Sequence, residues 1–510
     1  MKESQNLPAW HYIVLLVILT AGIIGIIFSW PIFLLILLTI LAVVLAWLYL
    51  PFILIFLPAV LPYLPAINPT ADIDLASGRL VIALLAVIGS IYIVYTRKSW
   101  FNLSTPTILI LFLLSWALFS GFVAEDPGRF IRKYLVFLTI FPIYFLSLAF
   151  LQKRKQWGKL FAYWSWSALL VSLIGLGQFL FQFAGGKERF FAYWGKFVAP
   201  ILYGTNAGEA VASNPSWLVN ISGVDVLRAI GTFPDPHMLA FYLGMSIPIQ
   251  VTYVLNRTPL SSPPLPVIPT EAEESLEQPE RDPFASALRA PLRVTTAVLW
   301  ILPILSLLVL LLTFSRGSYV GLAGVAIWLL FYVLKKGIDS IFVYRAIFVM
   351  FVAILAIFSI SPIRDRFTSI LDFNEGSNKG RLETWSEAID VIKYNPILGV
   401  GLGNYSNFVR PEADFREPIY AHNTYLDLAS ETGIPGTIAW ILLLFWGITP
   451  LWRNDSNKFN LAATLGIFWF SLHSLFETPI FSPQILPLIL VLLAYRTYIE
   501  SKMENEKIKK

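Results

Sequence analysis

Apolar runs of about 17 to 20 residues recur along the whole chain, and no other feature limits its fold so strongly. A helix of that length crosses the hydrocarbon core of a bilayer and satisfies its own backbone hydrogen bonds there. Of the 510 residues, 57% are hydrophobic and 14% are charged, whereas about a quarter are charged in a soluble domain. The sequence therefore predicts an all-α polytopic membrane protein.

The runs predict about fourteen spans, or about twelve if the first three form one span and a re-entrant hairpin around Pro31 and Pro51. Either number is even, so both termini are expected on the same side. The first run, His11–Ser29, lacks a small-residue cleavage site and is expected to be a retained anchor. The expected spans are 11–29, 31–49, 51–66, 79–96, 105–123, 134–151, 159–183, 238–255, 295–314, 318–334, 343–361, 434–450, 460–475 and 482–498.

Basic loops choose the orientation of the spans, because Lys and Arg accumulate on the cytoplasmic side. In this span count the basic residues fall mostly on one face, which is therefore expected to be cytoplasmic. A segment rich in Ser, Pro and Glu, 256–293, lies on the same face and is expected to be a disordered linker. The basic residues are Arg97, Lys98, Lys153, Arg154, Lys155, Lys335, Lys336, Arg453, Lys458, Lys507, Lys509 and Lys510.

The opposite, periplasmic face is expected to carry two large loops, 184–237 and 362–433. In the second loop, Leu382, Trp385, Ile389 and Ile392 recur at helical spacing, which predicts an amphipathic helix from Arg381 to Tyr394 that lies over the bundle. Aromatic residues at 190–194 predict an interfacial segment in the first loop.

A short outer loop with Arg129, Arg132 and Lys133 breaks the charge rule. It indicates either anionic-ligand binding or contact with lipid headgroups. The expected organisation is 1–183 N-terminal bundle, 184–237 periplasmic loop, 238–361 central helices with the linker, 362–433 periplasmic loop, and 434–510 C-terminal helices and cytoplasmic tail.

Three polar runs at the outer helix ends suggest chemistry there: 228–237, 313–322 and 421–427. An outer face has no ATP, so group transfer there needs an activated donor such as a sugar on a lipid diphosphate. Arg228 and Arg316 suit the diphosphate because the arginine fork binds phosphate oxygens bidentately. His422 suits the base, because an acceptor hydroxyl must lose its proton as the new bond forms.

Each of these residues also has an ordinary structural interpretation. A juxtamembrane arginine commonly anchors in headgroups, and a histidine at a helix start commonly caps or packs. His237 and His473 are competing candidates for the base. Asp72 and Asp74 form an Asp-X-Asp pair of the kind that holds a metal with substrate phosphates. The absence of cysteine excludes disulfides and thiolate chemistry.

The ordered set of motifs resembles the O-antigen ligase and polymerase superfamily of bacterial inner-membrane proteins. The similarity is clearest over 225–436. It rests on Arg228 with Gly231-Thr232-Phe233, the run Thr313–Leu322, Gly380-Arg381 with Trp385, Leu398–Gly401, and the run from His422 through Glu431 to Gly436.

The resemblance implies a GT-C-like bundle and metal-independent, inverting transfer of a glycan from undecaprenyl diphosphate on the periplasmic face, without a cofactor. By this resemblance, His422 activates the acceptor, and Arg228 and Arg316 bind the diphosphate. Further candidates for substrate binding are Arg381, Arg129, Arg132, Lys133, Asn423 and Glu431.

The expected partners are a lipid-linked glycan donor, a glycan or lipid A-core-like acceptor, and membrane lipids. The net charge of +5 follows from the positive-inside bias, and no nucleic acid is expected. Two alternatives stay open: a polysaccharide polymerase of the same superfamily, and a transporter of inorganic carbon. A transporter would place paired charges near the membrane midplane, whereas these charges lie at the outer edge.

Overall fold

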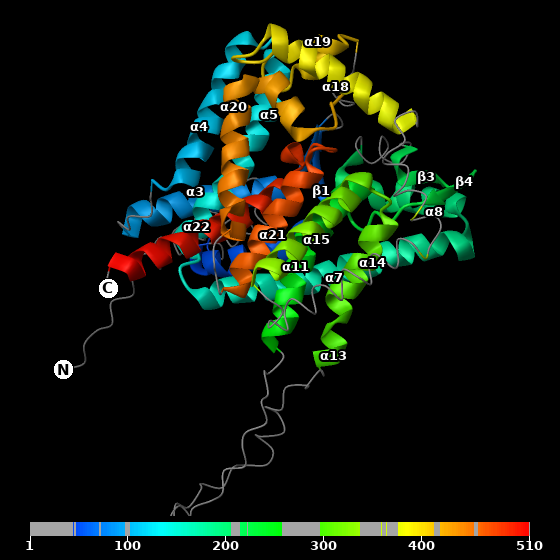
Figure 1. Cartoon of the computed structure of the whole chain (residues 1–510). Helices are drawn as coiled ribbons and strands as arrows, with labels where there is room; N and C mark the ends of the chain where they lie inside the picture. The colour runs from blue at the N-terminus through cyan, green and yellow to red at the C-terminus, as the bar shows by residue number, and fades with distance from the viewer. Residues whose placement is uncertain are drawn as a thin grey trace, which may run out of the picture.

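The computed structural model shows a helical bundle with two short β-hairpins attached (Figure 1). The chain is therefore an all-α polytopic membrane protein. Six helices in the described part of the chain are long and apolar enough to cross a membrane. The structure describes residues 44, 47–70, 73–96, 103–205, 215–221, 223–257, 296–336, 359, 364, 376–412, 419–452 and 457–508. The expected span 11–29, almost all of 343–361 and of the linker 256–293, and most of 31–49 lie outside these residues.

The N-terminal half begins with an apolar helix, Trp47–Tyr63, whose last turn is η1. The elements that follow are β1 Ala66–Thr70, β2 Ile73–Ala76, α3 Ser77–Thr96, α4 Thr105–Phe119, η2 Ser120–Val123, α5 Pro127–Ile140, α6 Pro142–Phe150, α7 Arg154–Gly185, α8 Lys187–Tyr193, the π-helical segment η3 Trp194–Val198, α9 Ala199–Tyr203, η4 Pro215–Trp217, β3 Leu218–Ile221 and β4 Val224–Leu227. Each hairpin is antiparallel.

The C-terminal half contains the helices that surround the three polar runs. They are α11 Pro236–Arg257, α13 Thr296–Leu299, α14 Ile301–Leu312, α15 Arg316–Lys336, α18 Gly376–Tyr394, α19 Tyr405–Val409, α20 Thr424–Ile448, η6 Thr449–Trp452, α21 Lys458–His473, η7 Pro479–Phe481 and α22 Leu486–Ile508. Helices α18 and α19 lie across the end of α20, at the top of Figure 1.

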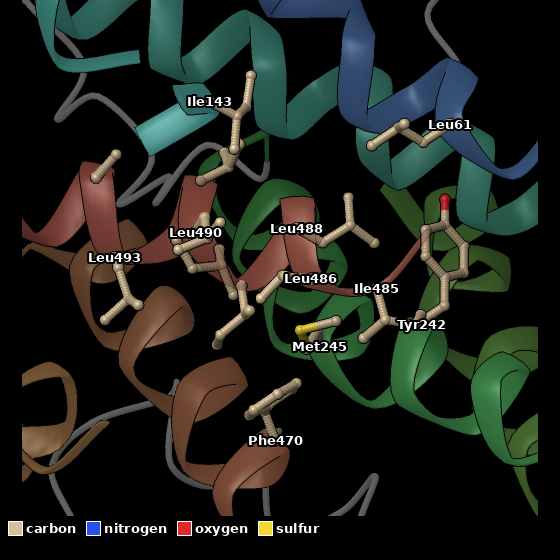
Figure 2. Packing of buried hydrophobic residues seen from close by; sticks show 14 of the residues in the cluster. Leu61, Ile143, Tyr242, Met245, Phe470, Ile485, Leu486, Leu488, Leu490 and Leu493 are labelled. Atoms are coloured by element: carbon tan, nitrogen blue, oxygen red, sulfur yellow. The ribbon is translucent and has the colours of Figure 1, made fainter. Parts of the chain in front are cut away.

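Helix α22 forms the centre of the bundle. Its first half is apolar on every side, as expected of a helix enclosed by others, and Leu486, Leu488 and Leu490 have no exposed surface. Figure 2 shows these leucines with Ile143 of α6 on one side and with Met245 of α11 and Phe470 of α21 on the other. Lipid is as apolar as leucine, so close packing rather than removal of water stabilises this centre.

The two ends of the bundle differ in character. At one end, Tyr495 of α22 contacts Trp157 near the start of α7, with ring centroids 5.1 Å apart, and Asn457 just before α21. Lys153 and Lys458 therefore lie at this end. Helix α15 runs antiparallel to α21, since Gly317 lies against His473 and Gly321 against Trp469, so the C-terminal end of α15 belongs to this end of the bundle. We call this the basic end.

The opposite end gathers the polar runs. There the end of α14, the starts of α11, α15 and α20, and the end of α21 meet. The start of α5 joins them through the turn at 401–404, because the backbone N–H of Asp126 donates to Asn404 Oδ1 at 2.7 Å. We call this the polar end.

Two local predictions need correction. Arg129, Arg132 and Lys133 lie in the first turns of α5 rather than in a loop, because Asp126 caps the helix and Pro127 begins it. On α18, Leu382 and Ile389 are exposed, and the packed face consists of the predicted Trp385 with Ala388 and Val391. In the aromatic segment of the first loop, Phe190 is buried against Trp194 and Trp217, whereas Tyr193 is exposed.

Candidate active site

His422 is in contact with Glu477 at the polar end. Its Nδ1 lies 3.1 Å from Glu477 Oε2. The His422 side chain is 52% exposed, whereas that of Glu477 is 8% exposed. A buried carboxylate thus faces one edge of a half-exposed imidazole, an arrangement that fixes both the ring orientation and the tautomer.

The other oxygen of Glu477 binds two further groups. Arg381, near the start of α18, places Nη2 2.7 Å from Glu477 Oε1, and His237 Nδ1 lies 3.4 Å from the same atom. Three elements far apart in sequence therefore converge on one carboxylate between α21 and η7.

Arg228 joins this group through His237. Its Nη2 lies 3.4 Å from His237 Nε2, while its Nε donates to the carbonyl of Thr313 and its Nη1 to the carbonyl of Ser216. Arg228 is 3% exposed, so these contacts hold a buried guanidinium in one place. A continuous line of polar contacts thus runs from Arg228 through His237 and Glu477 to His422.

Arg316 enters at the start of α15, directly after Ser315. The Ser315 hydroxyl lies 2.8 Å from His237 Nδ1 and 3.2 Å from His473 Nε2. Arg316 itself is 3% exposed. The polar run 313–322 therefore contributes Ser315 to the same region. Its next residue, Arg316, begins α15.

Backbone strain marks two of the three runs. Among the described residues, Phe314 and His422 are the non-glycine residues with left-handed φ, at 48° and 52°. Such conformations cost about 1 to 3 kcal/mol and persist where the surrounding structure enforces them. Both lie beside candidate residues, so the strain coincides with the site.

Hydrogen bonds between two loops enforce the strain at His422. The Thr424 hydroxyl donates to the carbonyl of Glu477 at 2.8 Å, and the Thr424 N–H donates to Ser474 at 2.9 Å. The buried Asp427 side chain accepts from the Ala421 N–H at 2.7 Å and from the Thr478 hydroxyl. Ala421, which precedes His422, and Thr478, which follows Glu477, are therefore both bound to the Asp427 carboxylate.

A second polar group lies further along α20. Lys133 of α5 places Nζ 2.6 Å from Glu431 Oε1 and 3.6 Å from the centre of the Phe481 ring. Arg129 pairs with Asp126 at 3.3 Å, while Arg132 is exposed. Lys133 therefore contacts α20 two turns beyond His422, and the basic residues of α5 lie at the same end of the bundle.

Asn423 and His473 have structural contacts that account for their positions. Asn423 caps α20, because its Oδ1 accepts from the N–H groups of Tyr425 and Leu426. The buried His473 ring stacks on Phe241 with centroids 3.8 Å apart. Within the described residues, no group of three or more histidines and carboxylates is placed to hold a metal ion, and Asp72 lies outside them.

The charges around His422 raise its pKa. The Glu477 carboxylate favours the charged ring, while burial and Arg381 act in the opposite direction. Burial favours the neutral form of Glu477, yet His237, His422 and Arg381 hold its pKa well below the usual range. Glu477 is therefore an anion that attracts a proton toward His422.

The sequence motifs missed Glu477. It lies 55 residues after His422 and outside the runs that carry the resemblance. In the sequence, Glu477 stands out only as a carboxylate between two expected spans, 460–475 and 482–498. The sequence indicates His237 only as a competing base, whereas the structure places it between Arg228 and Glu477.

Comparison with known families identifies part of this region. Residues 301–441 match the family model described as O-Antigen ligase. The matched segment includes Arg316, Arg381, His422 and Glu431, while Arg228 and Glu477 lie outside it. No curated protein matches the chain.

Proposed function

Because this chain belongs to the O-antigen ligase superfamily, we propose that it transfers a glycan from a polyprenyl diphosphate to an acceptor hydroxyl. The donor is an undecaprenyl diphosphate-linked glycan, and the site faces the periplasm. The reaction is inverting and independent of metal. The observation that carries the proposal is the line of contacts from Arg228 to His422 at one end of the bundle.

His422 acts as the general base in this proposal. Its Nδ1–H donates to Glu477, so the unprotonated Nε2 on the other edge of the ring accepts the proton of the acceptor hydroxyl. The hydroxyl oxygen attacks the anomeric carbon from the face opposite the diphosphate. The bond from that carbon to the diphosphate oxygen breaks, and its electron pair stays with the leaving diphosphate.

Arg228 and Arg316 stabilise the charge that develops on the diphosphate. Both are buried at the polar end, where a fixed positive charge acts more strongly than it does in water. Arg381, Arg129, Arg132, Lys133, Asn423 and Glu431 stay as candidates for contact with glycan or phosphate. Among them, Arg381 has the strongest support, because it binds Glu477 directly.

The basic residues support the orientation. Lys153, Lys336 and Lys458 belong to one end of the bundle and His422 to the other. Since lysine-rich ends face the cytoplasm, the polar end is the periplasmic one.

The test is transfer by the purified full chain from a lipid diphosphate glycan to a lipid A-core or glycan acceptor, with and without EDTA. We expect activity that EDTA leaves unchanged. His422→Ala should reduce the rate by about 10²- to 10⁴-fold, the usual contribution of a general base. Donor binding should persist, because a neutral base contributes little to the binding of an anion.

His473→Asn tests the competing base. This variant should retain transfer, because the His473 ring is fully buried and stacks on Phe241. Full activity of His422→Ala would refute its role. Activity lost with EDTA and restored by Mg²⁺ would favour the Asp72 and Asp74 pair instead. Chain extension of the donor glycan itself would identify a polymerase, and bicarbonate uptake without any transfer would identify a transporter.

A further inference from the structure

His237 lies between the two halves of the proposed site. It stands in the first turn of α11, where Asp235 holds its backbone N–H at 2.7 Å. One ring edge faces the Arg228 guanidinium at 3.4 Å. The other edge faces the Ser315 hydroxyl at 2.8 Å and Glu477 at 3.4 Å. The ring therefore touches both the arginine proposed for the diphosphate and the carboxylate behind the base.

The neighbours of His237 fix its tautomer. Arginine carries only donors, so Nε2 beside Arg228 must accept and cannot hold a proton. The proton of the neutral ring is then on Nδ1. There it is donated to Ser315 Oγ or to the Glu477 carboxylate, both of which can accept. Each ring nitrogen thus has one defined role.

We propose that His237 is a positioning residue that couples the diphosphate arginine Arg228 to the base-orienting carboxylate Glu477. This inference rests on the proposed function. In this role His237 touches neither substrate, and the neutral ring with its proton on Nδ1 holds both partners at once. The placement of the donor and the orientation of His422 then depend on the same imidazole.

Two substitutions separate the two edges of the ring. The amide nitrogen of His237→Asn lies close to the place of Nδ1, and that variant keeps a donor toward Glu477 but loses the acceptor for Arg228. The amide of His237→Gln reaches the place of Nε2, and that variant keeps an acceptor for Arg228 but loses the donor toward Glu477. A residue that merely fills space would not distinguish them.

The two variants should therefore differ in kinetics. His237→Asn should raise the donor KM by roughly 2- to 10-fold, the range that one hydrogen bond controls, with an unchanged pH midpoint of kcat. His237→Gln should keep the donor KM but move the pH midpoint of kcat upward. Glu477 with one donor fewer is a stronger base, and it favours the protonated form of His422.

Charged and titratable groups of several elements act on these two rings. Those around His237 include Arg228, Glu477, Arg381, His473 and Asp235, and those around His422 include Glu477, Arg381 and Asp427. All of them are retained and the imidazole is lost in both variants, so the difference between the two variants reports the hydrogen bonds of residue 237.

A second measurement is independent of activity. The chain has four histidines, so ¹⁵N-histidine labelling of the full protein in nanodiscs gives few signals, and the spectrum of His237→Asn assigns the one that disappears. We expect a neutral ring with its proton on Nδ1. An imidazolium, or a proton on Nε2, would overturn the proposal.

The outcomes separate this inference from the proposed function. If the wild-type chain transfers glycan but both variants match it, or both lose kcat and KM equally, the coupling role is refuted. If the wild-type chain transfers no glycan, the proposed function fails, whereas the ¹⁵N spectrum still tests the predicted tautomer.

Discussion

At the scale of single residues, the charge on His422 determines when it can act. Glu477 raises the pKa of His422, although burial and Arg381 oppose it. A general base must be unprotonated, so the transfer rate should rise with pH and level off above this raised pKa. Glu477→Gln removes the anion and lowers the pKa of His422. Its rise in kcat should therefore occur at lower pH, with a lower plateau because the ring loses its partner.

The kcat–pH profiles of the wild type and Glu477→Gln measure this effect. Glu412→Gln is the control, because Glu412 is an exposed carboxylate of the loop that carries His422. An unshifted or higher midpoint in Glu477→Gln would contradict the assigned role of Glu477.

Arg316 tests the need for the arginine fork. Lysine keeps the positive charge but loses the planar pair of donors. Arg316→Lys should therefore weaken donor binding and slow transfer, measured by donor titration and by initial rates. Arg257→Lys, at the other end of α11, is the matched control. Equal behaviour of the two variants would argue against a phosphate role for Arg316.

The candidate site was only partly predictable from the sequence. Arg228, Arg316 and His422 belong to polar runs at helix ends, which hydropathy makes visible. Glu477 carries no such signal, because its importance arises from contacts with residues on α11, α18 and the 421–424 loop. A pattern along the chain does not record which distant loops meet.

At the scale of elements, the glycine turn before α20 determines where that helix lies. Helix α18 ends at Tyr394, as Asn395-Pro396 predicts, and the chain then turns through Gly399, whose φ is 64°. Helix α20 is interrupted at Gly433, with φ 76°. There a Cβ atom would lie 2.1 Å from the carbonyl oxygen of Ile397. The sequence predicted a span only from 434, because the kink separates the polar first turns from the apolar part.

Gly433→Ala should therefore destabilise the protein. It combines a left-handed φ with a backbone clash, which together cost at least about 1 to 3 kcal/mol. Thermal unfolding in detergent measures the loss, and transfer should fall because α20 positions His422. Gly177→Ala is the control, because nothing lies within 4 Å of a Cβ there and α7 is regular. Equal stability of the two variants would contradict the role of the kink.

At the scale of the whole molecule, hydropathy predicted the spans but not their packing. The most apolar 18-residue stretch of the α4 span is more apolar than that of α11. Nevertheless, 33% of the α4 stretch is buried inside the protein, compared with 78% of the α11 stretch. Lipid accepts apolar surface as readily as a protein interior does, so apolarity alone cannot assign a helix to the centre. Polar residues such as Ser246 and Gln250 of α11 can be accommodated only inside the bundle.

The separation of the two bundle ends gives the last prediction, which concerns orientation. The chain has no cysteine, so single cysteines report accessibility without background. Ser386 on α18 is exposed at the polar end, and Glu504 near the end of α22 is exposed beyond the basic end. A membrane-impermeant maleimide should label Ser386→Cys in cells with a permeabilised outer membrane, because the lysine-rich end is held in the cytoplasm. Glu504→Cys should react only after the inner membrane is opened. The reverse pattern would put His422 in the cytoplasm, where a periplasmic donor could not reach it.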